Sequence, residues 1–192
     1  MSQDLPITSW ALLGLLSFGD GSDPGLTGYE LKQRADFTLR FYWVSPAMSQ
    51  VYSELRRLTD AGLVQPRGEG RGTTYTVTAA GRSALEHWMS ETPAGFPVFK
   101  HPVALRLMVG HLAAPGTLLR LLEEYADEVA AARADLADVR SSLVGSDAPG
   151  EALHHPSLVA DWGLAHFDSE AAITRDLLVR LQAAHHESEE ET

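Results

Sequence analysis

The hydrophobic positions between residues 45 and 62 repeat at the spacing of a helix. Val51, Leu55 and Leu58 lie four and three residues apart, so one face of a helix over this stretch is apolar. The opposite face carries hydrogen-bonding and cationic side chains, namely Ser49, Gln50, Tyr52, Ser53, Arg56 and Arg57. Such groups suit phosphate oxygens and base edges. The pattern therefore predicts a helix with one buried face and one face available to a polar partner.

Three residues set the predicted boundaries of this helix. Ser45 can cap it through its hydroxyl, and Pro46 suits the first helical position because its missing N–H would have no partner there. Gly62 ends it, since glycine readily takes the backbone conformation that follows a helix.

A β-hairpin is predicted directly after this helix. Residues 63–64 begin a strand, residues 67–72 form a glycine-rich tip that carries Arg67 and Arg71, and residues 73–78 return as a β-rich strand. A helix followed by a small basic hairpin is the working half of a winged helix-turn-helix. This arrangement indicates gene regulation rather than catalysis.

The remaining elements of the first half complete such a domain. A helix is predicted over residues 6–18, with an apolar stripe of Ile7, Ala11, Leu12, Leu15 and Leu16. A loop follows at 19–25. Thr27 caps a helix over 28–37 in which Leu31 and Ala35 face inward, and Thr78 caps one over 79–90 in which Leu85, Trp88 and Met89 do so.

Beyond a proline-rich linker at 91–102, the pattern is helical only, beginning with a short helix over 103–111. The strongest periodic signal alternates spacings of four and three through Leu118, Leu122, Tyr125, Val129, Ala132, Leu136, Val139 and Leu143. A last apolar helix is predicted over 157–184. The fold class is thus mainly α with a small β-hairpin wing: a winged helix-turn-helix domain at 1–92, a helical dimerisation domain at 93–186 and a disordered acidic tail at 187–192.

A heptad face this long needs an apolar partner, and two partners are possible. The last helix of the same chain could cover it, giving a helical hairpin, or the face could pack against a second subunit. The second subunit is the favoured partner, because two recognition helices related by a dyad read both halves of a palindrome. The side chains expected at the dimer interface are Leu118, Leu122, Tyr125, Val129, Leu136, Val139, Leu143, Trp162, Ile173 and Leu177.

The net charge of −11 is unusual for a protein that binds DNA, but it is unevenly distributed. Residues 32–82 hold eight basic and four acidic side chains, whereas residues 93–192 hold seven basic and sixteen acidic ones. Because affinity depends on the face presented to the phosphates, the basic region remains compatible with DNA binding.

Other kinds of site receive little support. The chain has no cysteine and no P-loop, dinucleotide or nucleophile-elbow motif, and its adjacent histidine pairs cannot easily face one ion, so we predict no enzyme, no cofactor and no metal site. The apolar run 5–18 is too short to cross a bilayer, and we expect a cytoplasmic protein. Trp10, Trp88 and Trp162 suggest a pocket for an aromatic or hydrophobic effector, although tryptophan is more often plain core.

Four segments in order resemble the PadR-like transcriptional regulators. They are TSWALLGLLSFG (8–19), LTGYELKQR (26–34), SPAMSQVYSELRRLTDAGLV (45–64) and TTYTVTAAGRSALEHWM (73–89). The resemblance implies a homodimeric repressor of palindromic double-stranded DNA that a small molecule releases. By position it places Tyr29, Lys32, Ser49, Gln50, Tyr52 and Arg56 near the DNA. Together with the exposed face and the wing, the expected DNA-binding set is Tyr29, Lys32, Ser49, Gln50, Tyr52, Ser53, Arg56, Arg67 and Arg71.

Alternatives stay open for several of these residues. Tyr52 could pack on the hairpin, Gln50 could be merely solvated, and Glu54 could engage Arg56 or Arg57 in a surface ion pair worth little energy. Adjacent arginines on a helix point in different directions, and Arg56 is the one expected to contact DNA. A winged-helix module that binds protein instead of DNA is the alternative function.

Overall fold

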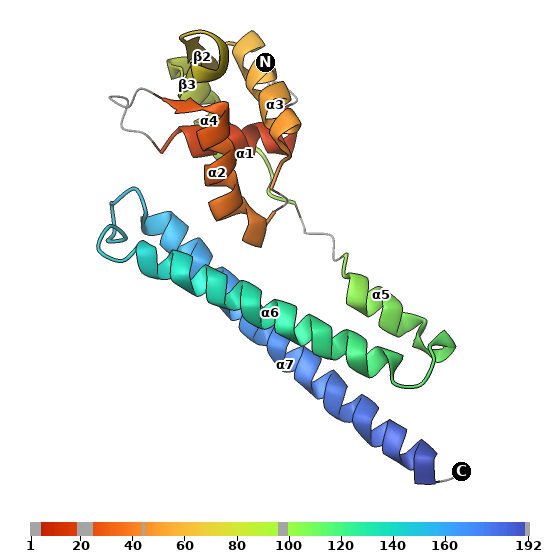
Figure 1. Cartoon of the computed structure of the whole chain (residues 1–192). Coiled ribbons are helices and arrows are strands. Elements are labelled where there is room, and N and C mark those ends of the chain that lie inside the picture. The colour runs from red at the N-terminus through yellow and green to blue at the C-terminus, as the bar shows by residue number, and fades with distance from the viewer. Residues whose placement is uncertain (1–4, 19–24, 44, 96–99, 191–192) are drawn as a thin grey trace. The chain divides into compact units, whose positions relative to one another are not determined.

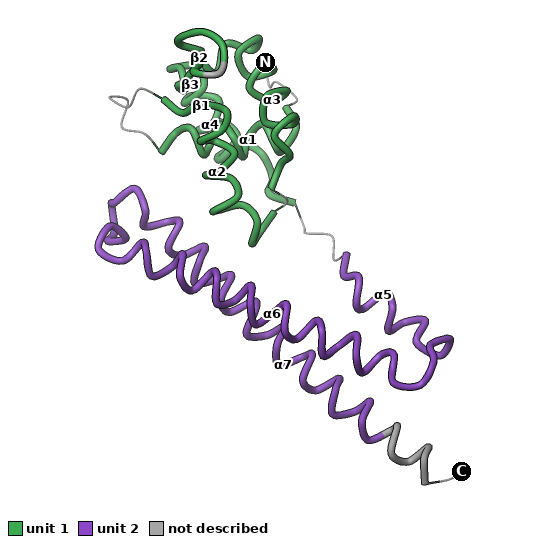
Figure 2. The backbone as a smooth tube through the Cα atoms, viewed as in Figure 1, with its two compact units in different colours: residues 1–95 green, residues 96–192 purple. Residues whose placement is uncertain are grey.

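The computed structural model describes residues 5–18, 25–43, 45–95 and 100–190 of the 192-residue chain. The chain divides into two compact units, Met1–Gly95 and Phe96–Thr192, which we call the wing unit and the hairpin unit (Figure 2).

The wing unit contains the predicted helices and hairpin together with one further strand (Figure 1). Its elements are α1 (Ile7–Leu16), β1 (Leu26–Thr27), α2 (Gly28–Thr38), η1 (Leu39–Phe41), α3 (Met48–Asp60), β2 (Val64–Arg67), η2 (Gly70–Gly72), β3 (Thr74–Val77) and α4 (Ala79–Glu91). The core forms where α1, α2 and α3 meet. Its fully buried aliphatic side chains include Leu12, Leu13, Leu31, Ala35, Val51, Leu55 and Leu58.

The sheet has the strand order β1-β3-β2, and both pairings are antiparallel. The hairpin was predicted, and its register pairs Val64 with Val77 and Arg67 with Thr74. Strand β1 was not predicted. It has only two residues, of which Leu26 pairs with Tyr75, and so short a segment carries no alternating pattern of its own.

The start of α3 differs from the prediction. The helix begins at Met48, and the residue before it, Ala47, has an extended backbone and no side-chain cap. The hydroxyl of Ser45 instead donates to Asp36 on α2, and Pro46 is buried. The predicted end is confirmed: Gly62 has φ +71°, and the N–H of Leu63 donates to the carbonyl of Leu58 at 2.9 Å.

The caps of the two neighbouring helices are confirmed. The Thr27 hydroxyl accepts from the N–H of Glu30, and the Glu30 carboxylate accepts from the N–H of Thr27, which together form a capping box. At α4 the Thr78 hydroxyl accepts from the N–H of Gly81 at 3.0 Å.

Two predicted core residues lie at the surface instead. Ile7 is 45% exposed at the first turn of α1, and Met89 is 73% exposed on α4. Leu13, which the predicted stripe of α1 left out, is fully buried. The reason is that α1 is surrounded on several sides by α2, α3, α4 and β3, so a single narrow stripe does not describe its buried surface.

The hairpin unit consists of helices only within its described residues. They are α5 (Pro102–Met108), η3 (Gly110–Leu112), α6 (Thr117–Ser142) and α7 (His154–Glu190), and α6 and α7 run side by side (Figure 1). Two ion pairs set their antiparallel register: Arg133 with Asp168, and Arg140 with Asp161, one heptad apart on both helices. A disordered tail was expected at residues 187–192. Helix α7 instead continues through Glu190, so the first four residues of that segment are helical.

The heptad face of α6 is covered within one chain. Leu122 and Leu136 are fully inaccessible, and Val129 and Val139 are buried as well, because α7 packs along this face. The expectation that these four side chains meet a second subunit is therefore corrected in favour of the intrachain hairpin. The heptad pattern specified an apolar partner, and a helix joined by residues 143–153 of the same chain satisfies that requirement at a smaller entropic cost than a separate subunit.

Tyr125 also points into the hairpin unit. Its hydroxyl donates to Glu170 at 3.1 Å, and the His101 Nε2 lies 2.9 Å from both the Tyr125 and the Glu170 oxygens. Burial, together with the charge of Glu170, raises the pKa of the Tyr125 hydroxyl. Because His101 caps α5 by accepting from Ala104, this network joins the start of α5 to α6 and α7.

Candidate nucleic-acid interface

Helix α3 has one buried apolar face and one exposed polar face, as predicted. Val51, Leu55 and Leu58 are fully buried, and the polar side chains predicted on the other face are exposed: Ser49, Gln50, Tyr52, Ser53, Arg56 and Arg57. The wing unit itself leaves this face uncovered. An exposed helix face with amide, hydroxyl and guanidinium groups has the chemistry needed to read a major groove.

Tyr52 packs on the N-terminal end of α2. A Cβ atom on Gly28 would lie only 2.6 Å from Cε1 of Tyr52, so the absence of a side chain at Gly28 creates the space for the ring. Tyr52 is nevertheless 44% exposed. The ring is therefore held in place from one side and remains open to a partner on the other.

Helix α2 adds one exposed aromatic residue to the same region. Tyr29 is 59% exposed and follows Gly28 directly, and its hydroxyl accepts from the Gln33 amide at 3.1 Å. Lys32 is less available than predicted, because its ammonium group pairs with Asp36 and its side chain is only 20% exposed. Hydrogen bonds from Lys32 and then Ser45 hold the pKa of the Asp36 carboxyl below its usual range.

The two adjacent arginines of α3 have different surroundings. The Nε of Arg57 donates to Glu54 at 3.1 Å, whereas the described residues give Arg56 no carboxylate partner. Glu54 is buried at 6% exposure and also accepts from the hydroxyl of Ser9 on α1. The expectation that Arg56 is the available cation agrees with this geometry.

Glu54 was not recognised as a core residue from the sequence. Its position supplied a signal, since it lies three residues after Val51 and four before Leu58, on the buried face. A buried carboxylate is tolerated here because two donors satisfy it.

The remaining residues expected to bind DNA lie on α3 and on the hairpin. Ser53 is exposed, but its hydroxyl donates to the carbonyl of Ser49 at 2.9 Å. Arg67 is exposed at the end of β2. Arg71 lies in η2 at the tip of the hairpin, and its side chain is outside the described residues.

The three tryptophans fall in different units. Trp10 and Trp88 stack in the wing unit, with ring centroids 5.5 Å apart and planes 10° apart. Trp162 is in the hairpin unit, 64% exposed and stacked on His166. The stack of Trp10 and Trp88 is accounted for by packing, and the effector pocket expected near all three stays a prediction.

Across the residues that the structure describes, no cluster of three histidine or carboxylate side chains is placed to hold a metal ion. None of the helices in the same residues is both long and apolar enough to cross a bilayer.

Together these elements form a winged helix-turn-helix unit, joined in the same chain to a helical hairpin. No protein-family model matches the chain. It is 34% identical over 88 residues to the negative transcriptional regulator PadR of Bacillus subtilis, a stretch that covers 43% of this chain and 45% of that protein. The chain thus matches less than half the length of this relative.

Solved structures match far more of the chain. The structure of Bacillus subtilis PadR in complex with operator DNA has a TM-score of 0.76 and 23% identity, covering 92% of this chain and 99% of that one. The same relative has also been solved with p-coumaric acid. The PadR-like regulator BC1756 of Bacillus cereus has a TM-score of 0.74 and 21% identity, with 92% and 98% covered. The virulence activator AphA of Vibrio cholerae also matches, with a TM-score of 0.71 and 22% identity, covering 92% of this chain and 98% of that one.

At these identities the likeness establishes the fold, in which a winged helix-turn-helix precedes a helical region. The resemblance to PadR-like transcriptional regulators found in the sequence is confirmed, over part of the chain by sequence and over most of it by fold.

Proposed function

We propose that this protein is a DNA-binding transcriptional regulator that acts as a homodimeric repressor. The observation that carries the proposal is the uncovered face of α3, where Gln50, Tyr52 and Arg56 are exposed on a helix whose other face is anchored in the core. The relative PadR is named a negative regulator and has been solved on operator DNA, which supports the same role. Such a regulator acts in the compartment that holds the DNA, which agrees with the expected cytoplasmic location.

In this proposal α3 enters the major groove. Gln50 can pair with adenine through its amide, Tyr52 and Ser49 contact base edges or phosphates, and Arg56 contacts phosphate. Tyr29 approaches from α2, while Arg67 and Arg71 approach the flanking backbone from the wing. Lys32 contributes only if it leaves Asp36, so we place it outside the main contact set.

We assign dimerisation to exposed apolar residues of α7. Leu158, Trp162 and Ile173 are more than half exposed and lie on the side of α7 that faces away from α6. Apolar side chains of this size, repeated along one helix face, are typical of a surface that a second subunit covers. A dimer places two α3 helices on one duplex, as a palindromic operator requires.

Selection of bound duplexes from a random library, followed by affinity measurements over a range of salt concentrations, tests the proposal. We expect a palindrome with half-sites about one helical turn apart. If Arg56, Arg67 and Arg71 of both subunits contact phosphates, log affinity falls with log salt at a slope on the order of −5. A protein-interaction module would select no sequence and show no such slope.

We further propose that a small aromatic or hydrophobic molecule relieves DNA binding, and that the face of the Trp10–Trp88 stack contacts it. The p-coumaric acid complex of the relative PadR supports an aromatic acid as the first compound to try. Adding p-coumaric acid and structurally related acids to the protein–operator complex tests this, with dissociation expected for the wild type and lost in Trp88→Ala.

A further inference from the structure

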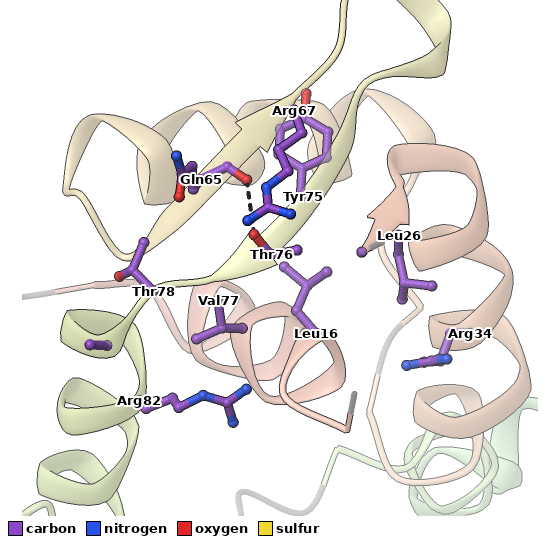
Figure 3. Close-up of a pocket in the computed structure, with 12 residues that line it drawn as sticks. Leu16, Leu26, Arg34, Gln65, Arg67, Tyr75, Thr76, Val77, Thr78 and Arg82 are labelled. Carbon is purple, nitrogen blue, oxygen red and sulfur yellow. Dashed lines mark hydrogen bonds between the residues drawn. The ribbon is translucent and has the colours of Figure 1, made fainter. Parts of the chain in front are cut away.

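A pocket of about 320 Å³ lies in the wing unit, and none of the residues that line it belongs to α3 (Figure 3). It is bounded by the end of α1, by β1 and α2, by the hairpin strands and by the start of α4. The residues that line it are Leu16, Gly25, Leu26, Arg34, Gln65, Arg67, Tyr75, Thr76, Val77, Thr78, Ala79 and Arg82. This volume is at the lower end of the range of small-molecule sites.

Part of the pocket wall is formed where β1 stops pairing with β3. Leu26 pairs with Tyr75, but the next residue toward the N-terminus, Gly25, has φ +86° and lies directly over the strand. A Cβ atom there would be 2.5 Å from the carbonyl oxygen of Tyr75. Gly25 therefore forms part of one wall, where its backbone lies against β3, and the following residues of β3, Thr76 and Val77, also line the pocket.

The charge of the lining is entirely positive. Three arginines contribute to it from three different elements, Arg34 from α2, Arg67 from β2 and Arg82 from α4, and its described residues include no carboxylate. Figure 3 shows their guanidinium groups around the side chains of Leu16 and Val77. No ion pair is described for Arg67 or Arg82 within the part of the chain that the structure covers.

Arg34 is held in place by the backbone. Its Nη1 donates to the carbonyl of Leu15 at 3.1 Å, near the end of α1. A guanidinium group has five N–H donors, so others remain for a ligand. The N-terminal end of α4, where Thr78 and Ala79 line the pocket, adds the positive end of a helix dipole.

We propose that this pocket binds an oxyanion, a phosphate or carboxylate group held by Arg34, Arg67 and Arg82. Guanidinium groups bind such anions through paired N–H donors, and the three arginines bring these donors to the pocket from three elements. The oxyanion has two possible sources, a small phosphorylated or carboxylated molecule and a backbone phosphate of bound DNA. Binding of the oxyanion itself does not depend on the function proposed above.

Inorganic phosphate is the probe for the first experiment, which needs no DNA. Thermal unfolding of the full chain is followed in potassium phosphate and in potassium chloride at equal ionic strength, and an amide NMR titration gives the dissociation constant. We expect phosphate to raise the melting temperature above its value in chloride, because a ligand of the folded state stabilises that state. Shifts of amide signals around Thr76–Ala79 locate the site.

Two arginine variants and one control make the result specific. Arg82→Gln and Arg67→Gln should each weaken phosphate binding by about tenfold or more, because a charge-assisted hydrogen bond is lost. Arg120→Gln, an exposed arginine of α6 in the other unit, should bind phosphate as the wild type does. The proposal is overturned if phosphate and chloride act alike, or if both pocket variants bind phosphate as tightly as Arg120→Gln.

A second experiment identifies the source of the oxyanion. If it is a DNA phosphate, Arg82→Gln lowers the salt dependence of operator binding by about one unit of slope. If the oxyanion belongs to a small molecule, Arg82→Gln binds the operator as the wild type does, although it binds phosphate more weakly. Either outcome, following phosphate binding in the first experiment, supports the site. Failure of DNA binding by the wild type would contradict the proposed function and leave the first experiment intact.

Discussion

The ring of Tyr52 on α3 lies against the backbone of Gly28 at the start of α2, in space that any side chain at position 28 would occupy. This contact joins the proposed recognition helix to the helix before it. It also orients the aromatic side chain that we expect to contact DNA.

Gly28→Ala should weaken operator binding without unfolding the protein. The new methyl group would lie 2.6 Å from Tyr52 Cε1, so the ring has to move. If a positioned contact is lost in this way, affinity falls by about 5-fold to 100-fold. Fluorescence anisotropy with the selected operator measures it. Gly14→Ala on α1 is the matched control, because nothing lies within 4 Å of its Cβ position, and it should bind like the wild type.

Tyr52→Ala should reduce operator affinity to the non-specific level while leaving helix content and subunit assembly unchanged. The ring is 44% exposed, so its loss removes a contact surface and little of the core. Gel-shift titration and far-UV circular dichroism check the two parts. Tyr52→Phe separates the roles of the ring and the hydroxyl. Wild-type affinity in Tyr52→Ala would show that another surface binds DNA.

Arg56→Gln should mainly weaken DNA binding, whereas Arg57→Gln should mainly lower stability. Arg56 is exposed toward the proposed DNA, so its replacement lowers affinity and reduces the salt slope by about one per subunit. Arg57 instead pairs with buried Glu54, and its replacement lowers the free energy of unfolding by about 1 kcal/mol with little loss of affinity. Urea denaturation and salt titrations of both variants distinguish these effects. The assignment is wrong if Arg57 alone affects DNA binding.

Thr27→Ala should destabilise the wing unit by about 1 kcal/mol at neutral pH, since it removes a helix cap. Hydrogen bonds from the backbone and then the side chain of Thr27 hold the pKa of the Glu30 carboxyl below its ordinary value of 4.5. A carboxyl with a lowered pKa stabilises the fold above its unfolded pKa, and this contribution disappears as the pH falls through the folded value. The difference between wild type and variant should therefore shrink below pH 4.5. Denaturation at several pH values tests this, and a constant difference would contradict the role of Glu30.

Leu136→Ala and Ile173→Glu should separate folding from assembly in the hairpin unit. Leu136 is fully buried between α6 and α7, so its truncation lowers the free energy of unfolding by about 2–5 kcal/mol. Ile173 is 54% exposed, so a charge there leaves the subunit folded and dissociates the dimer. Sedimentation analysis with circular dichroism reports both properties. If Ile173→Glu stays dimeric, the second subunit docks elsewhere.

Much of the wing unit was predictable because its signals are local. The capping box of Thr27 and Glu30 involves residues three apart, and the end of α3 at Gly62 needs only one residue that adopts a positive φ. The two faces of α3 follow from the helical period of Val51, Leu55 and Leu58. Such interactions act within one or two turns, so they leave a pattern in the sequence.

Two misplaced residues have partners on another element. Ser45 faces Asp36 of α2 instead of capping α3, and Glu54 accepts from Ser9 of α1, 45 residues away. Lys32 is different, because its partner Asp36 is only four residues away on the same helix, and the sequence did not show that this local ion pair would form. The oxyanion pocket could not be predicted either, since its arginines come from α2, β2 and α4.

By itself the sequence determined the order of helices and strands, the exposed polar face of α3 and the need of α6 for an apolar partner, because each follows from periodicity or capping along a short stretch. Only the tertiary structure decided what covers each surface. It placed α7 of the same chain on the heptad face, left Trp162 and Ile173 exposed, and set Tyr52 on Gly28. The physical reason is that hydrophobic periodicity reports that a face is buried, while the partner depends on chain connectivity and on contacts between distant residues.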